Sequence, residues 1–134
     1  MVEPNKEQTK VYFSWNDIGN LLNKLLEKIN KEGYQFVGVY GLPRGGLPIA
    51  VYFSNHLNIP LLKYPEPHCL IVDDIADSGN ALKNLIERHS YFIKDNYRIA
   101  TLHYKQKSVV KPHYSAKKAL VKDWIVYPWE DEMD

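Results

Sequence analysis

Apolar residues recur along the chain at two spacings, which predict helices and strands in alternation. One apolar stripe with positions three or four residues apart follows Ser14, a residue type that caps helix amino termini. The members of this stripe are Ile18, Leu21, Leu22, Leu25, Leu26 and Ile29. The pattern predicts a first helix that ends at Gly33, because glycine often terminates helices. It predicts two more helices, over about residues 47–57 and 80–89.

Short apolar runs predict the strands. They lie at residues 11–13, 36–40, 61–64, 69–72 and 97–104, and a partly extended segment at 124–130 closes the chain. Strands that alternate with helices are typical of a mainly parallel sheet with helices on both faces. The sequence therefore predicts a doubly wound α/β fold. We expect one minimal domain over residues 1–134, with a polar tail at 1–10.

Composition narrows the class of protein. The 134 residues are enough for one domain with its own core. A formal net charge of +1 gives no reason to expect nucleic acid as a partner, and no apolar stretch approaches the roughly 20 residues that span a bilayer. The amino terminus lacks the apolar region of a secretory signal, and Cys69 has no second cysteine to pair with. We expect a cytoplasmic protein with no membrane or nucleic-acid partner.

The segment "LIVDDIADSGN", residues 70–80, carries the first candidate site. It leads an apolar strand into three carboxylates, those of Asp73, Asp74 and Asp77, which must be hydrated, paired or bound to a ligand. The small residues 78–80 then open a helix, whose free N–H groups can hold a phosphate. A sugar phosphate satisfies both halves, since its hydroxyls can donate to the carboxylates. Helix capping is the simpler alternative, but it leaves the two carboxylates of the strand unexplained.

The segment "GLPRGG", residues 41–46, follows another predicted strand. Arg44 offers a planar guanidinium that suits a diphosphate, and Gly45 and Gly46 can add backbone donors. Alone, this loop could be an ordinary turn. Both loops, however, follow the carboxyl ends of strands, where ligands bind in open parallel sheets. Together they predict one site for a phosphorylated sugar.

These residues resemble a known family. "LIVDDIADSGNAL" resembles the 5-phosphoribosyl pyrophosphate (PRPP) motif of type I phosphoribosyltransferases, and "VYGLPRGGLPIA" resembles the pyrophosphate loop of that family. The likeness extends from "FSW" before the first helix to "WIVYPWE", which is similar to the Trp–Ile–x–x–Pro–Trp–acid ending of bacterial xanthine-guanine phosphoribosyltransferases. The resemblance implies the type I phosphoribosyltransferase fold. It also implies transfer of ribose 5-phosphate from PRPP to a 6-oxopurine (guanine, xanthine or hypoxanthine) in purine salvage, with release of pyrophosphate.

The resemblance implies individual roles as well. Asp73 and Asp74 would bind the ribose hydroxyls beside a magnesium ion, held directly or indirectly, and Asp77 would assist proton transfer near purine N7. The residues implied for the 5-phosphate are Ser78, Gly79, Asn80 and Ala81, and those for pyrophosphate are Arg44, Gly45 and Gly46. The residues implied for the base are Trp124, Ile125 and Glu130 in the closing segment 115–134, together with Lys105, which would donate to the 6-oxo group. Mg²⁺ would be the cofactor, and a dimer or tetramer the assembly.

The residues alone favour plainer roles for two of these positions. Lys105 has Lys107 and Lys111 close by, which indicates a solvated basic loop. Trp124 is of a type that more often fills a core or an interface than it holds a base. His103, on an apolar strand, is interpreted as a structural histidine rather than a catalyst.

Two departures from the family leave an alternative open. Ala81 stands where many relatives carry threonine, so one bond to the 5-phosphate is lacking. Only "PEPH", residues 65–68, stands where relatives carry a long loop that closes over the site, and four residues cannot form a lid. We expect the basic stretch 105–118, rather than the polar tail 1–10, to cover the site, with 106–114 mobile until PRPP and magnesium bind. The alternative function is a regulatory protein that binds PRPP or a nucleotide without efficient catalysis.

Overall fold

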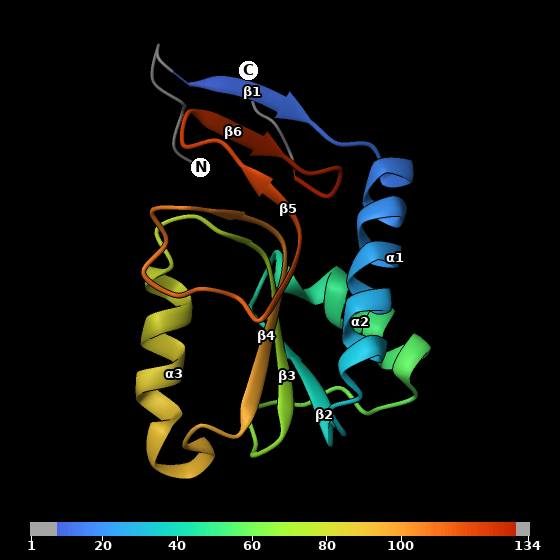
Figure 1. Cartoon of the computed structure of the whole chain (residues 1–134), viewed down its shortest axis with the longest axis vertical. Helices are drawn as coiled ribbons and strands as arrows, with labels where there is room; N and C mark the ends of the chain where they lie inside the picture. The colour runs from blue at the N-terminus through green and yellow to red at the C-terminus, as the bar shows by residue number, and fades with distance from the viewer. Residues whose placement is uncertain (1–7, 131–134) are drawn as a thin grey trace.

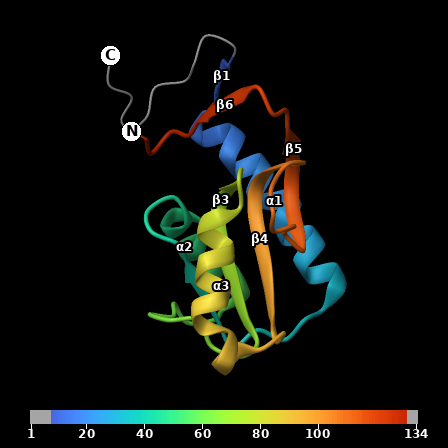
Figure 2. The ribbon, with the colours of Figure 1, turned by 90° about the vertical axis from the view of Figure 1, so that its left-hand side faces the viewer.

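The structure is a computed structural model, and it describes residues 8–130 (Figure 1). Four parallel strands form the central sheet in the order β2–β3–β4–β5, with bounds Gly38–Gly41, Cys69–Ala76, Tyr97–Lys105 and Tyr114–Ala119. Helices α1 (Trp15–Glu32) and α2 (Gly46–Leu57) cover one face, and α3 (Asn80–Ile93) covers the other (Figures 1 and 2). The predicted α/β fold, with parallel strands flanked by helices, is confirmed.

A second, smaller sheet lies across the carboxyl ends of the central strands. It consists of β1 (Thr9–Tyr12) and β6 (Asp123–Val126), which pair in parallel. Figure 1 shows this pair above the end of the central sheet at which α3 begins. The pairing joins the first described strand to the closing segment, so both contribute to the same end of the molecule.

The first helix forms as its sequence predicts. The Ser14 hydroxyl accepts from the Asp17 N–H (3.0 Å), and the Ser14 N–H donates to the Asp17 carboxylate (2.9 Å), which completes a capping box. The helix ends at Gly33, whose φ of 74° suits glycine. The apolar stripe faces the sheet, and its buried members are Ile18, Leu21, Leu22, Leu25 and Ile29.

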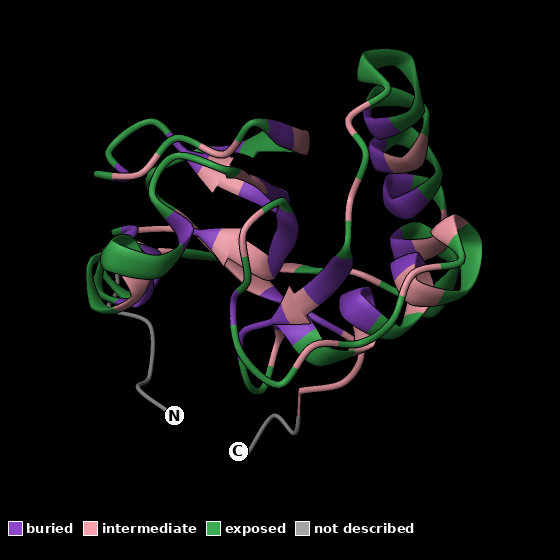
Figure 3. Cartoon of the chain, turned by 90° about the horizontal axis from the view of Figure 1, so that it is seen from below, coloured by how far each residue is buried: buried purple, intermediate pink, exposed green. Residues whose placement is uncertain are grey.

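Apolar side chains fill both interfaces between the sheet and the helices. Leu25, Phe53 and Leu70 are fully buried on the α1 and α2 side, and Ile71 and Ile93 on the α3 side. Figure 3 shows that buried positions concentrate in the strands and on the inner sides of the helices, with exposed positions on the outer helix surfaces. Each such side chain stabilises the fold by about 1.5–3 kcal/mol. The packed layers therefore hold the strand ends, and the loops that leave them, in fixed positions.

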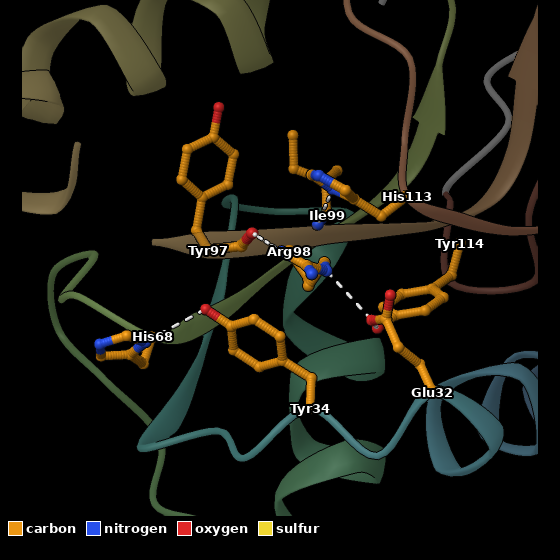
Figure 4. Close-up of polar contacts among 8 residues, drawn as sticks. All are labelled: Glu32, Tyr34, His68, Tyr97, Arg98, Ile99, His113 and Tyr114. Carbon is orange, nitrogen blue, oxygen red and sulfur yellow. Dashed lines mark hydrogen bonds and ion pairs between the residues drawn. The ribbon is translucent and has the colours of Figure 1, made fainter. Parts of the chain in front are cut away.

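Polar contacts fasten the opposite end of the sheet, at the amino ends of the strands (Figure 4). The Arg98 guanidinium donates to the Glu32 carboxylate (Nε–Oε1 3.0 Å) and lies 4.3 Å from the ring centroid of Tyr34. The Tyr114 hydroxyl donates to the same Glu32 oxygen. These contacts join the end of α1 to β4 and β5. They connect residues more than 60 positions apart, so the local sequence pattern does not contain them.

Several strand bounds differ from the predictions. The strand at 61–64 does not form, and only Leu61 pairs, in an isolated bridge to Val39. The strand at 69–72 continues to Ala76, so the acidic pair lies within β3 instead of after it. Strand β5 was not predicted, because "YSAKKA" has no apolar run. Strand β1 begins at Thr9, so the polar tail is shorter than 1–10, and its residues 1–7 lie outside the described part.

The short connection at 65–68 lies at the amino ends of the strands. The Val37 N–H donates to the His68 carbonyl (3.0 Å), and the His68 N–H donates to the Asn96 carbonyl (2.6 Å). Both partners directly precede strands, so this connection lies at the far end of the sheet from the acidic pair. The connection is therefore unable to cover the candidate site. Within residues 8–130, no helix is both long and apolar enough to cross a bilayer.

Candidate functional site

The acidic pair uses its own carboxylates to bind backbone N–H groups. The Asp74 N–H donates to Asp73 Oδ1 (2.8 Å), and the Ile75 N–H donates to Asp74 Oδ1 (2.7 Å). Both residues are half-buried near the carboxyl end of β3. The carboxylates are thus held in place by the strand that carries them, and each keeps an oxygen free of these two bonds.

Burial makes this pair costly to ionise. Burial, together with the smaller effect of the nearby Asp74 charge, raises the pKa of the Asp73 carboxyl to about 8. Burial likewise raises the pKa of Asp74. A bound cation, or hydroxyl donors from a ligand, would relieve this cost. The electrostatics therefore favour a ligand at the pair.

The glycine-rich loop lies directly against the acidic pair. The Leu42 N–H donates to the Val72 carbonyl (3.0 Å), which attaches the loop to β3. A Cβ on Gly45 would overlap the Asp74 carboxylate, and one on Gly46 would overlap the Val72 carbonyl. Arg44, between them and a proline, is exposed. The structure thus brings the two predicted loops into contact.

The small-residue turn precedes α3 as predicted. Gly79 is the residue before the helix and has a φ of 81°, which glycine tolerates. The Ser78 hydroxyl accepts from the Asn80 N–H (3.2 Å). The N-cap residue Gly79 provides no side-chain cap, so apart from the Asn80 N–H that donates to Ser78 the amino terminus of α3 is open to an anion. Asn80 and Ala81 are exposed there.

The segment that follows β4 packs against this turn. The Val109 N–H donates to the Ser78 carbonyl (2.9 Å), and a Cβ on Gly79 would overlap the Ser108 hydroxyl. The expectation that the whole stretch 105–118 covers the site is therefore wrong for its second half, because Tyr114–Lys118 belong to β5 in the central sheet. The mobility of residues 106–114 remains a prediction, although Tyr114 is the first residue of β5.

A cavity of about 160 Å³ opens beside the acidic pair, between β3 and β6. The residues that line it are Asp74, Ile75, Asp77, Asp123, Trp124, Ile125, Tyr127 and Glu130. Five of these are predicted site residues, which the fold brings together from the acidic turn and the closing segment. Ile75, Asp123 and Tyr127 were missed. The signal for Tyr127 was its place within the "WIVYPWE" segment, at a position where the family pattern specifies no residue type.

Lys105 lies behind this cavity and is not solvated. It is 1% exposed, and its ammonium donates to the carbonyls of Asp123 (2.6 Å) and Val121 (3.1 Å). It also lies 3.3 Å from the Asp77 carboxylate. The interpretation of Lys105 as part of a solvated basic loop is therefore wrong. Lys107, which is half exposed, lies 3.3 Å from the other oxygen of Asp77.

The described residues could hold a magnesium ion only in part. Within residues 8–130, no group of three or more histidine, cysteine, aspartate and glutamate side chains is arranged as a metal site. Asp73 and Asp74 nevertheless supply two oxygen donors whose charges repel each other. Mg²⁺ commonly binds one or two carboxylates together with substrate phosphates and water. The pair therefore fits an ion that shares its coordination with a diphosphate ligand.

Solved structures place this geometry among known proteins. No protein-family model matches the chain, and no curated protein does. Solved structures do match. A purine phosphoribosyltransferase from Pyrococcus horikoshii is similar with a TM-score of 0.82 and 29% identity, over 93% of this chain and 97% of that one.

Two more distant structures share the fold. A xanthine-guanine-hypoxanthine phosphoribosyltransferase from Helicobacter pylori has a TM-score of 0.79 at 20% identity, over 91% of this chain and 94% of that one. A hypothetical protein from Neisseria gonorrhoeae with bound ppGpp has a TM-score of 0.79 at 21% identity, over 92% and 90%. Nearly the whole described chain thus matches each of these structures.

Proposed function

We propose that this chain, whose fold matches that of purine phosphoribosyltransferases, is a type I phosphoribosyltransferase that transfers the phosphoribosyl group of PRPP to a 6-oxopurine. Guanine, xanthine and hypoxanthine are the candidate bases, and pyrophosphate is the leaving group. The observation that carries the proposal is the order of the sites along β3. The loop with Arg44, the acidic pair and the base cavity adjoin one another, as the parts of the two substrates require.

PRPP would bind across the two loops. Its 5-phosphate would lie on the turn of residues 78–81, at the open amino terminus of α3. Its ribose hydroxyls would donate to Asp73 and Asp74, which offsets the burial that raises the pKa values of both carboxyls. The diphosphate would face Arg44 and the loop 42–46. Asp73 and Asp74 are the residues that would help to hold Mg²⁺, which would supply positive charge to the leaving diphosphate when bound.

The base would occupy the cavity under β6. Trp124 offers a stacking surface, and Ile125 and Glu130 would face the 2-position of the purine. For Lys105 to reach the 6-oxo group, its ammonium must exchange one of its three present contacts. Asp77 is the contact whose side chain lines the cavity, so it is the one that a base would replace.

The residues would act mainly by positioning and electrostatics. Displacement at the anomeric carbon gives it oxocarbenium character, which nearby carboxylates stabilise, and holding both reactants in line removes much of the entropic barrier. Asp77 would assist proton transfer near purine N7. Its carboxylate is suited to this, since it lines the cavity and lies between two ammonium groups. The sugar and base would thus be aligned by groups of this chain alone.

A transfer assay tests the proposal. PRPP, Mg²⁺ and a radiolabelled purine should give the nucleoside monophosphate and pyrophosphate with guanine, xanthine or hypoxanthine. Adenine should be a poor substrate, because its 6-amino group cannot accept from Lys105. Asp77→Asn should lower turnover by about 10²-fold or more. Preference for adenine would contradict the 6-oxopurine assignment.

A second candidate function is nucleotide-dependent regulation without turnover. One observation favours it: the connection 65–68 lies at the far end of the sheet and cannot shield the anomeric carbon from water. A structure of the same fold also holds ppGpp. Binding of PRPP or ppGpp with no transfer to any of the bases would support the regulator and contradict the enzyme.

A salvage role in the cytoplasm and a dimeric or tetrameric assembly belong to the same proposal. The half-exposed apolar side chains of Trp15, Leu47 and Val51 on α1 and α2 support an assembly. Light scattering of the purified chain measures its mass in solution. A monomer at assay concentration would remove this part of the proposal and leave the chemistry untouched.

A further inference from the structure

Tyr127 connects the acidic pair to the base cavity. It is 2% exposed, and its hydroxyl donates to the main-chain carbonyl of Asp74 (3.1 Å). The same hydroxyl oxygen lies 2.8 Å from Nδ1 of His103. Because the hydroxyl proton is used toward Asp74, the Nδ1–H of His103 is the donor to Tyr127. One phenol therefore links the closing segment to β3 and β4.

The surroundings of His103 hold its Nδ1–H toward the Tyr127 hydroxyl. It is 1% exposed, and Phe13 packs edge-on against its ring at a centroid distance of 4.6 Å. Its Nε2 is buried and has no hydrogen-bond partner in the described part of the chain. A second proton on Nε2 would have no acceptor. The imidazole is thus neutral, with its single proton on the nitrogen that faces Tyr127.

The anchor point of Tyr127 on β3 is rigid. Its hydroxyl holds the carbonyl of the peptide that joins Asp74 to Ile75, and the N–H of that same peptide donates to Asp74 Oδ1 (2.7 Å). Gly45 packs against the other carboxylate oxygen, Oδ2. The hydroxyl is therefore fixed to the peptide that also orients the Asp74 carboxylate.

The backbone and ring of Tyr127 form part of the cavity proposed for the purine base. Its N–H donates to Glu130 Oε1 (2.8 Å), and the Glu130 N–H donates to the Tyr127 carbonyl (3.0 Å). Its ring stacks on Trp129 with centroids 5.0 Å apart and planes 2° apart. Tyr127 and Glu130 both line the cavity. A shift of Tyr127 would therefore move the wall of the base site.

We propose that Tyr127 is a positioning residue that fixes the base cavity relative to the ribose carboxylates, with His103 as its support. This inference rests on the proposed function of the cavity. It predicts which ligands depend on Tyr127 for their affinity. A ligand that occupies only the sugar site should not depend on the Tyr127 hydroxyl, whereas one that spans the sugar and base sites should.

Tyr127→Phe tests this prediction, because the substitution keeps the ring and removes only the hydroxyl. Calorimetric binding should be compared for Mg-PRPP, which occupies the sugar site, and GMP, which occupies the sugar and base sites. We expect GMP affinity to fall about five- to tenfold, the size of one lost hydrogen bond, with PRPP affinity within about twofold. Tyr52→Phe is the matched control, since it removes a hydroxyl bond to Asn23 (3.0 Å) between α2 and α1. It should leave both affinities unchanged.

A second pair of variants acts through His103 and keeps the test valid if Tyr127→Phe folds poorly. His103→Leu removes the donor to Tyr127 and should reproduce the selective loss of GMP affinity. His103→Asn retains an N–H donor and should restore affinity to within about twofold of the parent. Equal losses for PRPP and GMP, or no loss for GMP, would overturn the inference. If the parent protein bound neither ligand, the proposed function itself would fail before any variant was compared.

Discussion

The Asp74 carboxylate lies against the backbone of Gly45, in the space that a Cβ on residue 45 would occupy. This contact sets the distance between the loop that carries Arg44 and the acidic pair of β3. It also gives a physical reason for glycine at a position whose backbone dihedral angles any residue could adopt (φ −61°, ψ −28°). The glycine is needed for space, not for conformational freedom.

Gly45→Ala should therefore displace the Asp74 carboxylate. We expect PRPP affinity to fall about tenfold or more, with about 1–3 kcal/mol lost from the free energy of unfolding through overpacking. Gly19→Ala is the matched control, because nothing lies within 4 Å of a Cβ at Gly19 in α1. It should stabilise the protein by about 0.5–1 kcal/mol and leave binding unchanged. Calorimetry and thermal melts measure both, and unchanged PRPP affinity in Gly45→Ala would contradict the contact.

Ionisation of the acidic pair should destabilise the ligand-free protein as pH rises. The pKa of Asp73 is about 8 in the folded protein and about 3.9 in an unfolded chain. Between these values the folded state binds a proton that the unfolded state does not, so stability decreases from about pH 4 to about pH 8. Asp73→Asn should weaken this decrease, leaving the part due to Asp74, and should raise stability at pH 8 by about 1 kcal/mol, because solvent still screens a half-buried site.

The control for this prediction is Asp17, whose pKa is shifted in the opposite direction. The backbone and side chain of Ser14 lower the pKa of Asp17, so its contribution is present above that pKa and lost as pH falls through it. Asp17→Asn should therefore not raise stability at pH 8. Denaturant titrations of the three proteins between pH 4 and 8, without Mg²⁺, give the comparison. An Asp73→Asn variant with the same pH slope as the parent would show that the Asp73 carboxyl is not buried as described.

The helices and the site motifs could be predicted because their signals are local. The stripe of α1 repeats every three or four residues, and its Ser14–Asp17 capping box spans four positions. The acidic turn is likewise one continuous segment. Strand β5 has no such signal: its Lys117 and Lys118 are exposed, and it is held by distant contacts such as the bond from Lys28 to the Ser115 carbonyl (2.6 Å). Local pattern cannot reveal an edge strand of this kind.

The burial of Lys105 and the contacts of Tyr127 could not be predicted from the residues alone for the same reason. A lysine near other lysines indicates a solvent-exposed side chain, and only the folded chain shows that two carbonyls 16 and 18 positions away accept hydrogen bonds from its ammonium. The Tyr127 hydroxyl reaches a carbonyl 53 positions away. Their roles come from tertiary contacts, which override the preference of an isolated residue. The family resemblance supplied Lys105 but not Tyr127, which stands at an unspecified position of the motif.

The two lysines beside Asp77 should behave differently when their charge is removed. Lys105→Met leaves two carbonyls of the 121–123 loop without their donor, so stability should fall by about 2–4 kcal/mol. The Michaelis constant for a 6-oxopurine should also rise about tenfold or more, with a smaller change for PRPP. Lys107→Met is the matched control at the same 3.3 Å from Asp77. As a surface pair it should cost less than about 1 kcal/mol. Equal effects of the two variants would contradict the role of Lys105.

The last prediction concerns the cover of the site. An oxocarbenium-like carbon must be kept from water, and the connection 65–68 lies too far away to do so. Residues 106–113 are the best-placed segment, because they leave β4 beside the phosphate turn. We expect amide exchange in this segment to slow when PRPP and Mg²⁺ bind. The Val109 N–H should be protected in both states, since it already donates to Ser78 (2.9 Å). Strand β5 is the internal control and should not change. Equal exchange of 106–113 with and without ligand would eliminate it as the cover, and an uncovered site should then hydrolyse PRPP measurably in the absence of purine.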